Sequence, residues 1–325
     1  MSDPETAEAL VYVAPGEARI ETVALPPMTE DVAEVRALCG ALSRGTERLV
    51  FEGRVPESER ERMRAPFQAG EFPFPVRYGY ATAGVVEDGP ADLRGRTVFA
   101  LHPHQTRFRV PAGSLVPLPD GVAPERAVLA ANAETALNAI WDAAPPPGAR
   151  ILVVGAGLLG CLVAGILSLS GHVEVHIADT VSDRAGALSD FNVTFLQPDA
   201  VAAGYHAAFH TSATAAGLQC AIDALAFEGE VIELSWYGDA PVTLSLGGAF
   251  HSRRLAIRSS QVGQVARPRR ASTTRRDRLA RAVALLADAR FDRLITGEVA
   301  FADLPAAIPR LLAPGAPGIA TRIRY

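Results

Sequence analysis

The sequence contains no lysine: its 31 basic residues are all arginine, against 36 Asp and Glu, which leaves a net charge of −5. Without lysine the chain cannot form a Schiff base, anchor pyridoxal phosphate, build a P-loop or use a Tyr-Lys catalytic pair. The small net charge argues against general affinity for nucleic acid. We therefore expect neither lysine-based chemistry nor a nucleic-acid partner.

Cysteine is also scarce, because the chain has only Cys39, Cys161 and Cys220. Their wide spacing excludes a disulfide framework and a CxxC zinc knuckle, and it indicates a reducing, cytoplasmic compartment. The opening residues, MSDPETAEAL, are acidic and lack the apolar core of a signal peptide. The most apolar stretch, 151–169, contains four glycines, which favours a buried strand and helix over a membrane span. We expect a cytoplasmic protein with no membrane partner.

The pattern of the sequence changes near residue 125, and a chain of 325 residues is long enough for two domains. Residues 9–122 are strand-like segments interrupted by Gly and Pro. The strand candidates there are 33–38, 83–86 and 97–101. A charged segment, 57–64, predicts a helix, and the Pro- and Phe-rich segment 66–75 predicts a loop.

Strands and helices alternate from 125 to 262, which is typical of a doubly wound α/β fold with a parallel sheet. The strand candidates are 150–154, 172–179, 207–211, 230–234 and 255–259, and the helix candidates are 125–144, 158–169 and 218–226. An Arg-rich loop leads to a helix over 275–289, with Thr274 as its cap and Asp277 in its first turn, and 319–325 returns to a strand. We therefore assign 125–262 to one domain, and 1–124 with 263–325 to a second, β-rich domain.

Residues 155–160 read GAGLLG and match GxGxxG, which is weak evidence by itself. The context strengthens it, because the motif follows the apolar strand 150–154 and opens a helix. An acidic residue, Asp179, ends the next strand, 19 residues after Gly160. Together these features predict a Rossmann domain that binds a dinucleotide. The alternative is a Rossmann fold whose ligand is lost or different.

Each position of this motif has a physical role toward the cofactor. Gly155 permits a tight turn, Gly157 lets the backbone approach the pyrophosphate, and Gly160 lets the helix pack close to the strand. Leu158 and Leu159 begin the helix whose N-terminal dipole faces the pyrophosphate.

The acidic residue at the end of the second strand bears on the choice of cofactor. Asp179 can accept hydrogen bonds from the adenosine ribose and would repel a 2′-phosphate, which favours NAD over NADP. Arg184 is near enough to complicate this preference. We expect NAD as the cofactor, with NADP as the alternative.

A β-rich domain, a Rossmann domain and a C-terminal return resemble the medium-chain dehydrogenase/reductase superfamily, the zinc alcohol dehydrogenase-like proteins. Residues 79–86, GYATAGVV, are similar to the family's GHE-x-x-G-x-V. Residues 132–137 resemble the segment whose threonine, here Thr135, lies beside the nicotinamide, and Ile295-Thr296 with Phe301 resembles the C-terminal return. The resemblance implies a GroES-like catalytic domain, a small-molecule substrate and a homodimer. Residues 242–246 alternate as an edge strand of that dimer would.

The departures from this family concern its metal. The positions of the catalytic zinc ligands fall on Arg44 (or Ser43), on Tyr80 and Ala81, and on Ala131, and the four-cysteine structural lobe is missing. We therefore expect no catalytic zinc. Residues 42–47, LSRGTE, with 51–53, FEG, resemble the SxGTE signature of zinc-less members. Among these members are bacteriochlorophyllide dehydrogenases, which oxidise a hydroxyethyl group.

Without zinc, hydrogen-bond donors must stabilise the developing alkoxide. The resemblance implies that Arg44, Thr46 and Tyr80 surround that oxygen, with Tyr80 as proton donor or acceptor. Alternatively, Tyr80 simply fills the emptied metal site and Arg44 pairs with Glu47. Glu134 either faces the cleft, as we expect, or caps its helix.

Two further features remain. His102 and His104 form an HxH pair, which on a strand would put both rings on one face and could suit a metal. No third ligand is evident, so a pocket wall is favoured over a metal site, and a solvent-facing pair is favoured over both.

Ten arginines between Arg253 and Arg281 are interpreted as a solvated loop and helix face. The alternative is that Arg253 or its neighbour Arg254 binds an anionic substrate or the cofactor phosphates.

The residues and the resemblance together predict a zinc-independent, NAD(P)-dependent oxidoreductase. It would transfer a hydride between nicotinamide and a secondary alcohol or carbonyl. One alternative is reduction of an activated double bond, as in quinone-type zinc-less members. The other is a dinucleotide-binding protein without turnover.

Overall fold

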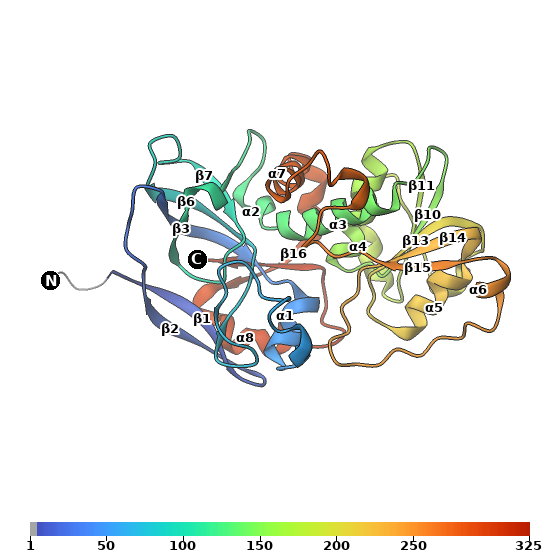
Figure 1. Ribbon diagram of the computed structural model, residues 1–325, viewed down its shortest axis with the longest axis horizontal. Helices are drawn as coiled ribbons and strands as arrows, with labels where there is room; N and C mark the ends of the chain where they lie inside the picture. Colours follow the sequence, from blue (N-terminus) through green and yellow to red (C-terminus); the bar gives the residue numbers. More distant parts are fainter. Residues whose placement is uncertain (1–4) are drawn as a thin grey trace. The chain divides into compact units, whose positions relative to one another are not determined.

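A computed structural model of the protein describes residues 5–325 and separates them into two units (Figure 1). The first takes in the described residues up to Ala131, with Leu286–Asp288 and Ile295–Tyr325. The second takes in Asn132–Leu285 and Ala289–Leu294. The sequence pattern places these changes at 125 and 263 instead.

The first unit is β-rich. Its strands are β1 Thr6–Ala14, β2 Glu17–Ala24, β3 Val32–Ala41, β4 Ala69–Gly70, β5 Val76–Arg77, β6 Thr82–Asp88, β7 Thr97–Ala100, β8 Arg107–Pro111, β9 Val116–Pro117, β16 Ile295–Ala300 and β17 Ala320–Arg324. Its α-helices are α1 Arg44–Phe51, α2 Pro124–Ala127 and α8 Leu304–Leu311, and its 3-10 helices are η1 Glu57–Glu59, η2 Ala112–Ser114 and η7 Phe301–Asp303.

These strands form two sheets. One has the order β2-β1-β5-β4, and the other has the order β16-β17-β3-β6-β7-β9, with β8 paired to β3. Val35, Val86, Val98 and Phe108 from the second sheet are almost fully buried and form part of its core. The alternation of side chains along β3, β6, β7 and β8 places these four residues on one face of the sheet.

The second unit alternates strands and helices. Its strands are β10 Arg150–Val154, β11 Glu174–Ala178, β12 Thr194–Leu196, β13 Tyr205–His210, β14 Leu225–Glu233 and β15 Ala256–Ser259. Its α-helices are α3 Ala130–Ala143, which begins just before the unit, α4 Leu158–Leu169, α5 Ala215–Asp223, α6 Ala249–Ser252 and α7 Arg275–Leu285. Its 3-10 helices are η3 Ser182–Leu188, η4 Pro198–Ala200, η5 Arg267–Arg269 and η6 Ala289–Leu294.

The six strands of this unit form one sheet in the order β12-β11-β10-β13-β14-β15, and every neighbouring pair is parallel (Figure 1). The chain moves outward from β10 in one direction and then returns to build β13 to β15 on the other side. This reversal defines a doubly wound sheet with a switch point between β10 and β13. The predicted α/β fold class is confirmed.

Two predicted elements are wrong, and a third is helical as predicted but divided. Residues 57–64 contain one 3-10 turn, Glu57–Glu59, because a segment charged on all sides has no apolar face to bury. The helix predicted over 125–144 is split into α2 and α3. Residues 242–246 form no strand: Val242 and Leu244 pack on the core, and the backbone of Ser245 bonds the side chain of Gln219.

Among residues 5–325, no helix is long and apolar enough to cross a membrane.

Candidate functional site

The turn between β10 and α4 is shaped by its glycines. Gly155 has φ +106°, and a Cβ atom there would lie 2.8 Å from Thr211 Oγ1. At Gly160 a Cβ would lie 1.8 Å from the carbonyl oxygen of Gly155, which no side chain can tolerate. At Gly157 a Cβ would meet nothing within 4 Å. Two glycines are therefore required by the chain itself, whereas Gly157 borders open space.

The same turn leaves the start of α4 without a side-chain cap. Gly157 is the N-cap residue, and it makes no side-chain cap hydrogen bond to the first turn. Leu158 and Leu159 are partly exposed there, while Gly160 to Leu167 are buried. Uncapped amide groups at a helix start are suited to an anion such as a phosphate.

Asp179 follows the carboxyl end of β11 and is 8% exposed. Its Oδ2 accepts hydrogen bonds from the Ala156 amide at 2.6 Å and from Arg184 Nη1 at 3.0 Å. Its Oδ1 accepts from the Val181 amide at 2.8 Å. The carboxylate therefore fixes the glycine turn and holds an arginine beside itself. The two side chains that the sequence analysis related to the choice between NAD and NADP lie together.

Tyr80 lies in a group of hydroxyls in the first unit. Its O–H donates to Ser43 Oγ at 2.6 Å, and it also interacts with Thr46. Burial raises the pKa of Tyr80 to about 12, against the opposing effect of these two hydroxyls. Tyr80 is therefore a neutral hydrogen-bond donor at physiological pH.

Glu47, which the sequence analysis did not assign to the site, organises the residues behind this group. It is fully buried, and its Oε1 accepts from the Ser43 amide at 2.7 Å. Its Oε2 accepts from Tyr12 O–H at 3.0 Å and lies 2.9 Å from His104 Nε2. The glutamate of the SxGTE pattern was the available signal.

Arg44 does not pair with Glu47, contrary to the alternative considered for it. Its Nη1 donates to the carbonyl oxygens of Ala316 and Gly318, both at 3.0 Å, and its Nη2 donates to that of Pro317 at 2.7 Å. The guanidinium thereby holds the loop that leads into β17. A direct catalytic role for Arg44 stays a prediction.

The HxH pair is neither solvent-facing nor on one face of a strand. His102 and His104 follow β7 and are 7% and 0% exposed. His102 stacks on Phe108 with ring centroids 3.9 Å apart, and burial lowers the pKa of His102 to about 3. Since His104 is engaged with Glu47, the two rings point to different partners.

The residues present do not fit a catalytic zinc. Within residues 5–325, no three His, Cys, Asp or Glu side chains are grouped closely enough to hold a metal ion. The closest pairing in this region, His104 with Glu47, is completed by Tyr12 rather than by a third ligand. We derive no chemical step through a metal.

Comparisons of sequence and structure differ in what they find. No family model matches the chain, and no curated protein matches it in sequence. Among solved structures, it is similar to a dehydrogenase from Sinorhizobium meliloti 1021 described as zinc-binding and bound to NADP. That match has 15% identity and a TM-score of 0.78, and covers 99% of this chain and 100% of the other.

Two further structures match over 98–99% of this chain and 99% of their own length. One is 2R,3R-butanediol dehydrogenase from Bacillus subtilis, with 15% identity and a TM-score of 0.76. The other is L-idonate 5-dehydrogenase from Escherichia coli, with 14% identity and a TM-score of 0.78. The chain has the fold of these dehydrogenases.

Glu134, on α3 of this dehydrogenase fold, is 5% exposed and forms an ion pair with Arg278 of α7, with Oε1 3.0 Å from Nε. Burial raises the pKa of Glu134, and Arg278 opposes that shift. Arg278 also donates to Asn138 Oδ1 and to the Gln264 carbonyl oxygen. Glu134 is thus buried within the second unit rather than capping a helix, and its neighbour Thr135 is partly exposed on α3.

The arginine cluster is not wholly solvated, since Arg278 is only 1% exposed. Arg254 pairs with Glu228 at 2.7 Å on the surface, and Arg253 Nη1 lies 3.4 Å from the Leu225 carbonyl oxygen. Both arginines therefore have contacts within the unit. Their binding of an anion stays untested.

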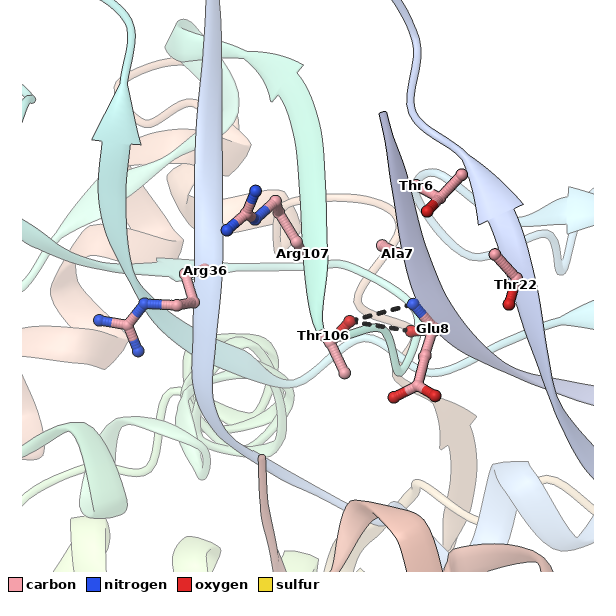
Figure 2. A pocket seen from close by; sticks show the side chains of 7 residues that line it. All are labelled: Thr6, Ala7, Glu8, Thr22, Arg36, Thr106 and Arg107. Carbon is pink, nitrogen blue, oxygen red and sulfur yellow. Dashed lines mark hydrogen bonds between the residues drawn. The ribbon is translucent and has the colours of Figure 1, made fainter. Parts of the chain in front are cut away.

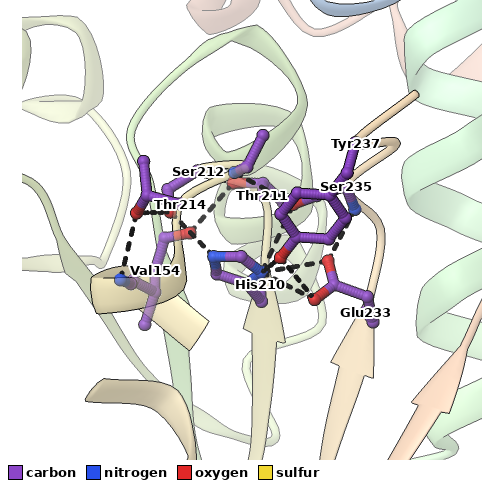
Figure 3. A network of polar contacts seen from close by, with 10 residues as sticks. Val154, His210, Thr211, Ser212, Thr214, Glu233, Ser235 and Tyr237 are labelled. Carbon is purple, nitrogen blue, oxygen red and sulfur yellow. Dashed lines mark hydrogen bonds and ion pairs between the residues drawn. The ribbon is translucent and has the colours of Figure 1, made fainter. Parts of the chain in front are cut away.

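A polar network that the sequence analysis missed lies at the carboxyl ends of β13 and β14 (Figure 3). His210 is fully buried, with Nδ1 2.8 Å from Glu233 Oε2 and Nε2 2.7 Å from Ser212 Oγ. Tyr237 O–H donates to Glu233 Oε2 at 3.1 Å. Only the parallel pairing of β13 with β14 brings these distant positions together.

A separate hollow of about 400 Å³ lies in the first unit, beside β1, β2, β3 and β8 (Figure 2). It is lined by Thr6, Ala7, Glu8, Thr22, Arg36, Thr106 and Arg107. Both arginines are engaged with Glu87, at 2.6 Å for Arg36 and 3.2 Å for Arg107. None of the predicted site residues lines this hollow.

Proposed function

We propose that this chain is a zinc-independent, NAD(P)-dependent oxidoreductase that transfers a hydride between nicotinamide C4 and a secondary alcohol or carbonyl. The observation that carries the proposal is the turn at 155–160. Its two required glycines and uncapped helix start lie at the carboxyl edge of a doubly wound sheet, beside Asp179. This combination is suited to a dinucleotide. Similar structures described as dehydrogenases, one of them bound to NADP, support it.

The cofactor-binding residues are Gly155, Gly157, Leu158, Leu159 and Gly160 around the pyrophosphate, with Asp179 on the adenosine ribose and Thr135 beside the nicotinamide. We propose NAD as the preferred cofactor, because the Asp179 carboxylate would repel a 2′-phosphate. Arg184 on that carboxylate makes NADP the alternative.

The choice between the two cofactors is tested at Asp179. An Asp179→Ala variant should bind NAD more weakly and discriminate less against NADP, as measured by fluorescence titration with both cofactors. Unchanged selectivity would remove Asp179 from the ribose.

We assign the chemistry at the substrate to the hydroxyls of Tyr80, Ser43 and Thr46. In the direction of carbonyl reduction, a nicotinamide held beside Thr135 would supply the hydride to the carbonyl carbon, and Tyr80 O–H would give its proton to the carbonyl oxygen. Ser43 and Thr46 hold that hydroxyl. Arg44 and Glu134, expected from the sequence to be catalytic, are proposed to support these groups by positioning, because both side chains are engaged in other contacts.

Zinc independence is supported by the side chains that replace the ligands expected for this fold: Arg44 or Ser43, Tyr80, Ala81 and Ala131. Elemental analysis of the purified protein should find less than one zinc per chain. A stoichiometric zinc would overturn this part of the proposal, with His102 and His104 the first residues to re-examine.

The likeness of 42–47 to the SxGTE signature supports a secondary alcohol as substrate.

The activity is tested by fluorescence titration with nicotinamide cofactors, followed by a screen of secondary alcohols, ketones, aldehydes and enones. We expect binding, and turnover on an alcohol–carbonyl pair. Turnover on enones alone would favour reduction of an activated double bond. Tight binding without turnover on any class would identify a dinucleotide-binding protein without catalysis.

The role of Tyr80 is tested by Tyr80→Phe. Removal of a general acid lowers kcat by about 100-fold or more, and the Kd of the cofactor should not change. Tyr78→Phe is the matched control, since its ring centroid is 5.9 Å from that of Tyr80. Equal kcat values for Tyr80→Phe and the wild type would reduce Tyr80 to a packing residue.

A further inference from the structure

The buried His210–Glu233 pair has no part in the function proposed above, and its position calls for one. His210 ends β13 and Glu233 ends the neighbouring strand β14, at the carboxyl edge of the sheet. The Ser235 amide also donates to Glu233 Oε1, at 2.7 Å. Figure 3 shows the imidazole between the carboxylate on one side and the hydroxyls of Ser212 and Thr214 on the other.

The hydrogen bonds of this network allow a direction for its protons that satisfies every member, and we adopt it for the inference. The Gly217 amide donates to Thr214 Oγ1 at 3.0 Å, and Thr214 Oγ1 lies 2.9 Å from Ser212 Oγ. Thr214 can therefore donate to Ser212, Ser212 to His210 Nε2, and His210 Nδ1 to Glu233. This series of hydrogen bonds satisfies every donor and acceptor in it when the imidazole is neutral and the carboxylate is ionised. The pair then carries one net negative charge.

The surroundings of Glu233 keep that charge in place. Burial opposes its ionisation, but the hydrogen bond and the electrostatic attraction of His210, together with the hydrogen bonds from Ser235, outweigh burial and lower the pKa of Glu233. Its side chain is 12% exposed. No arginine is found among the contacts of Glu233 in residues 5–325, whereas Glu230 on the same strand is held by Arg258 at 2.6 Å.

The place of this charge in the fold decides what it can act on. A doubly wound sheet binds a dinucleotide across its switch point, with one mononucleotide on each half. The half with β10 to β12 carries the glycine turn and Asp179, which suit the adenosine part. The half with β13 to β15 must then take the nicotinamide nucleotide, and its carboxyl edge carries Glu233.

We propose that Glu233, held by His210, is a charge-bearing positioning residue that makes the protein favour oxidised over reduced nicotinamide. The oxidised ring carries a positive charge and the reduced ring is neutral, so a fixed negative charge nearby stabilises the oxidised form selectively. The rest of the dinucleotide is the same in both forms. This inference rests on the function proposed above.

The charge also biases the direction of the reaction on the protein. Carbonyl reduction would consume bound NADH and a proton and would yield an alcohol and positively charged NAD⁺. Stabilising NAD⁺ therefore favours carbonyl reduction in the bound state. Within the proposed pair of a secondary alcohol and its carbonyl, it points to the ketone as the substrate.

The test compares the Kd of NAD⁺ with that of NADH for the full-length wild type and for Glu233→Gln, which removes the charge and keeps one of the two acceptor oxygens. A unit charge within about 8 Å of another changes its binding on the order of fivefold where protein and water share the space between them. We expect the ratio of the two Kd values, NAD⁺ over NADH, to rise by about that factor in the variant. A merely structural role would change both Kd values equally and leave the ratio unaltered.

The matched control is Glu230→Gln, which removes a paired carboxylate three residues earlier on β14 and should leave the ratio as in the wild type. If Glu233→Gln does not fold, a double variant, His210→Asn with Glu233→Gln, replaces the pair by two amides that can bond each other and serves the same test. An unchanged ratio in the folded variant overturns the inference. A wild type that binds neither NAD(H) nor NADP(H) overturns the proposed function instead.

Discussion

His102 and His104 show at the level of single residues how burial decides what a histidine can do. Both were open in sequence to a metal, a pocket wall or solvent. In the structure His104 contacts a buried glutamate, while His102 stacks between rings and stays neutral because its pKa is lowered to about 3. A neutral, stacked imidazole contributes to stability in a pH-dependent way.

His102 should make the protein sensitive to acid. Its pKa is lower in the folded protein than the ordinary 6.5, so the stability due to the neutral ring is fully present above pH 6.5 and is lost as the pH falls toward 3. One such group changes the free energy of unfolding by up to about 1.4 kcal/mol per pH unit. His102→Asn should remove this slope in urea unfolding at pH 7, 5 and 4.

His172→Asn, at an exposed position, is the control for that experiment and should keep the wild-type slope. Equal slopes for all three proteins would show that His102 does not titrate in this way.

At the level of elements, the β10–α4 turn separates the demands of folding from those of binding. Gly160 is required because the helix approaches the strand too closely for any side chain, whereas no neighbour of Gly157 among residues 5–325 requires a glycine there. The open space beside Gly157 is what the close approach of a bound ligand would use.

Alanine at these two glycines should therefore have opposite effects. Gly160→Ala should lower the free energy of unfolding by at least about 1–3 kcal/mol, because the added methyl overpacks the turn. Gly157→Ala should change it by less than about 1 kcal/mol, and weaken NAD binding by about tenfold or more, equal to about 1.4 kcal/mol. Thermal unfolding and cofactor titration of both variants measure this, and normal binding by Gly157→Ala would contradict it.

The contact between α3 and α7 is a second feature at this scale. Arg278 and Glu134 are both buried, so neither charge can be left alone without a large loss. Arg278→Met should lower the free energy of unfolding by about 3–5 kcal/mol, because it leaves Glu134 unpaired. Arg281→Met on the exposed side of α7 should change it by less than about 0.5 kcal/mol. Equal urea midpoints for the two variants would argue against the ion pair.

At the level of the whole molecule, the sheet of the second unit ends in β15, a strand paired only to β14 in the described residues. Ile257 on this strand is 36% exposed. An open parallel edge with an exposed apolar side chain can pair with a second copy. We therefore propose a homodimer through β15 rather than through 242–246, which forms no strand.

The dimer predicts a mass of twice the 34.3 kDa chain in light scattering. Ile257→Glu should shift the protein to monomer by placing a charge on the pairing edge, with an unchanged circular dichroism spectrum. Leu246→Glu, at a position 41% exposed, is the comparison and should leave the dimer intact. Dissociation by Leu246→Glu alone would return the interface to 242–246.

Much of the fold could be predicted because its signals are local. The apolar run of β10, the glycines after it and Asp179 lie within about 30 residues, and each reports its own backbone requirement. The site was harder to predict, because Tyr80 and Ser43, or His210 and Glu233, are far apart in sequence and meet only through strand and loop pairing. The helix at 57–64 and the strand at 242–246 failed because a local pattern lacked a partner to pack or bond with.

The sequence by itself determined the doubly wound sheet, the glycine turn and the absence of lysine chemistry, since these depend on residue type and short spacing. The tertiary structure decided which polar groups are buried together. In it, Glu47 bonds the Ser43 amide near Tyr80, and Arg44 bonds the loop before β17. Arg278 is buried in an ion pair with Glu134, and His210 contacts Glu233. The reason is physical: a charge taken out of water must find a partner, and that partner is fixed by the packing of distant segments.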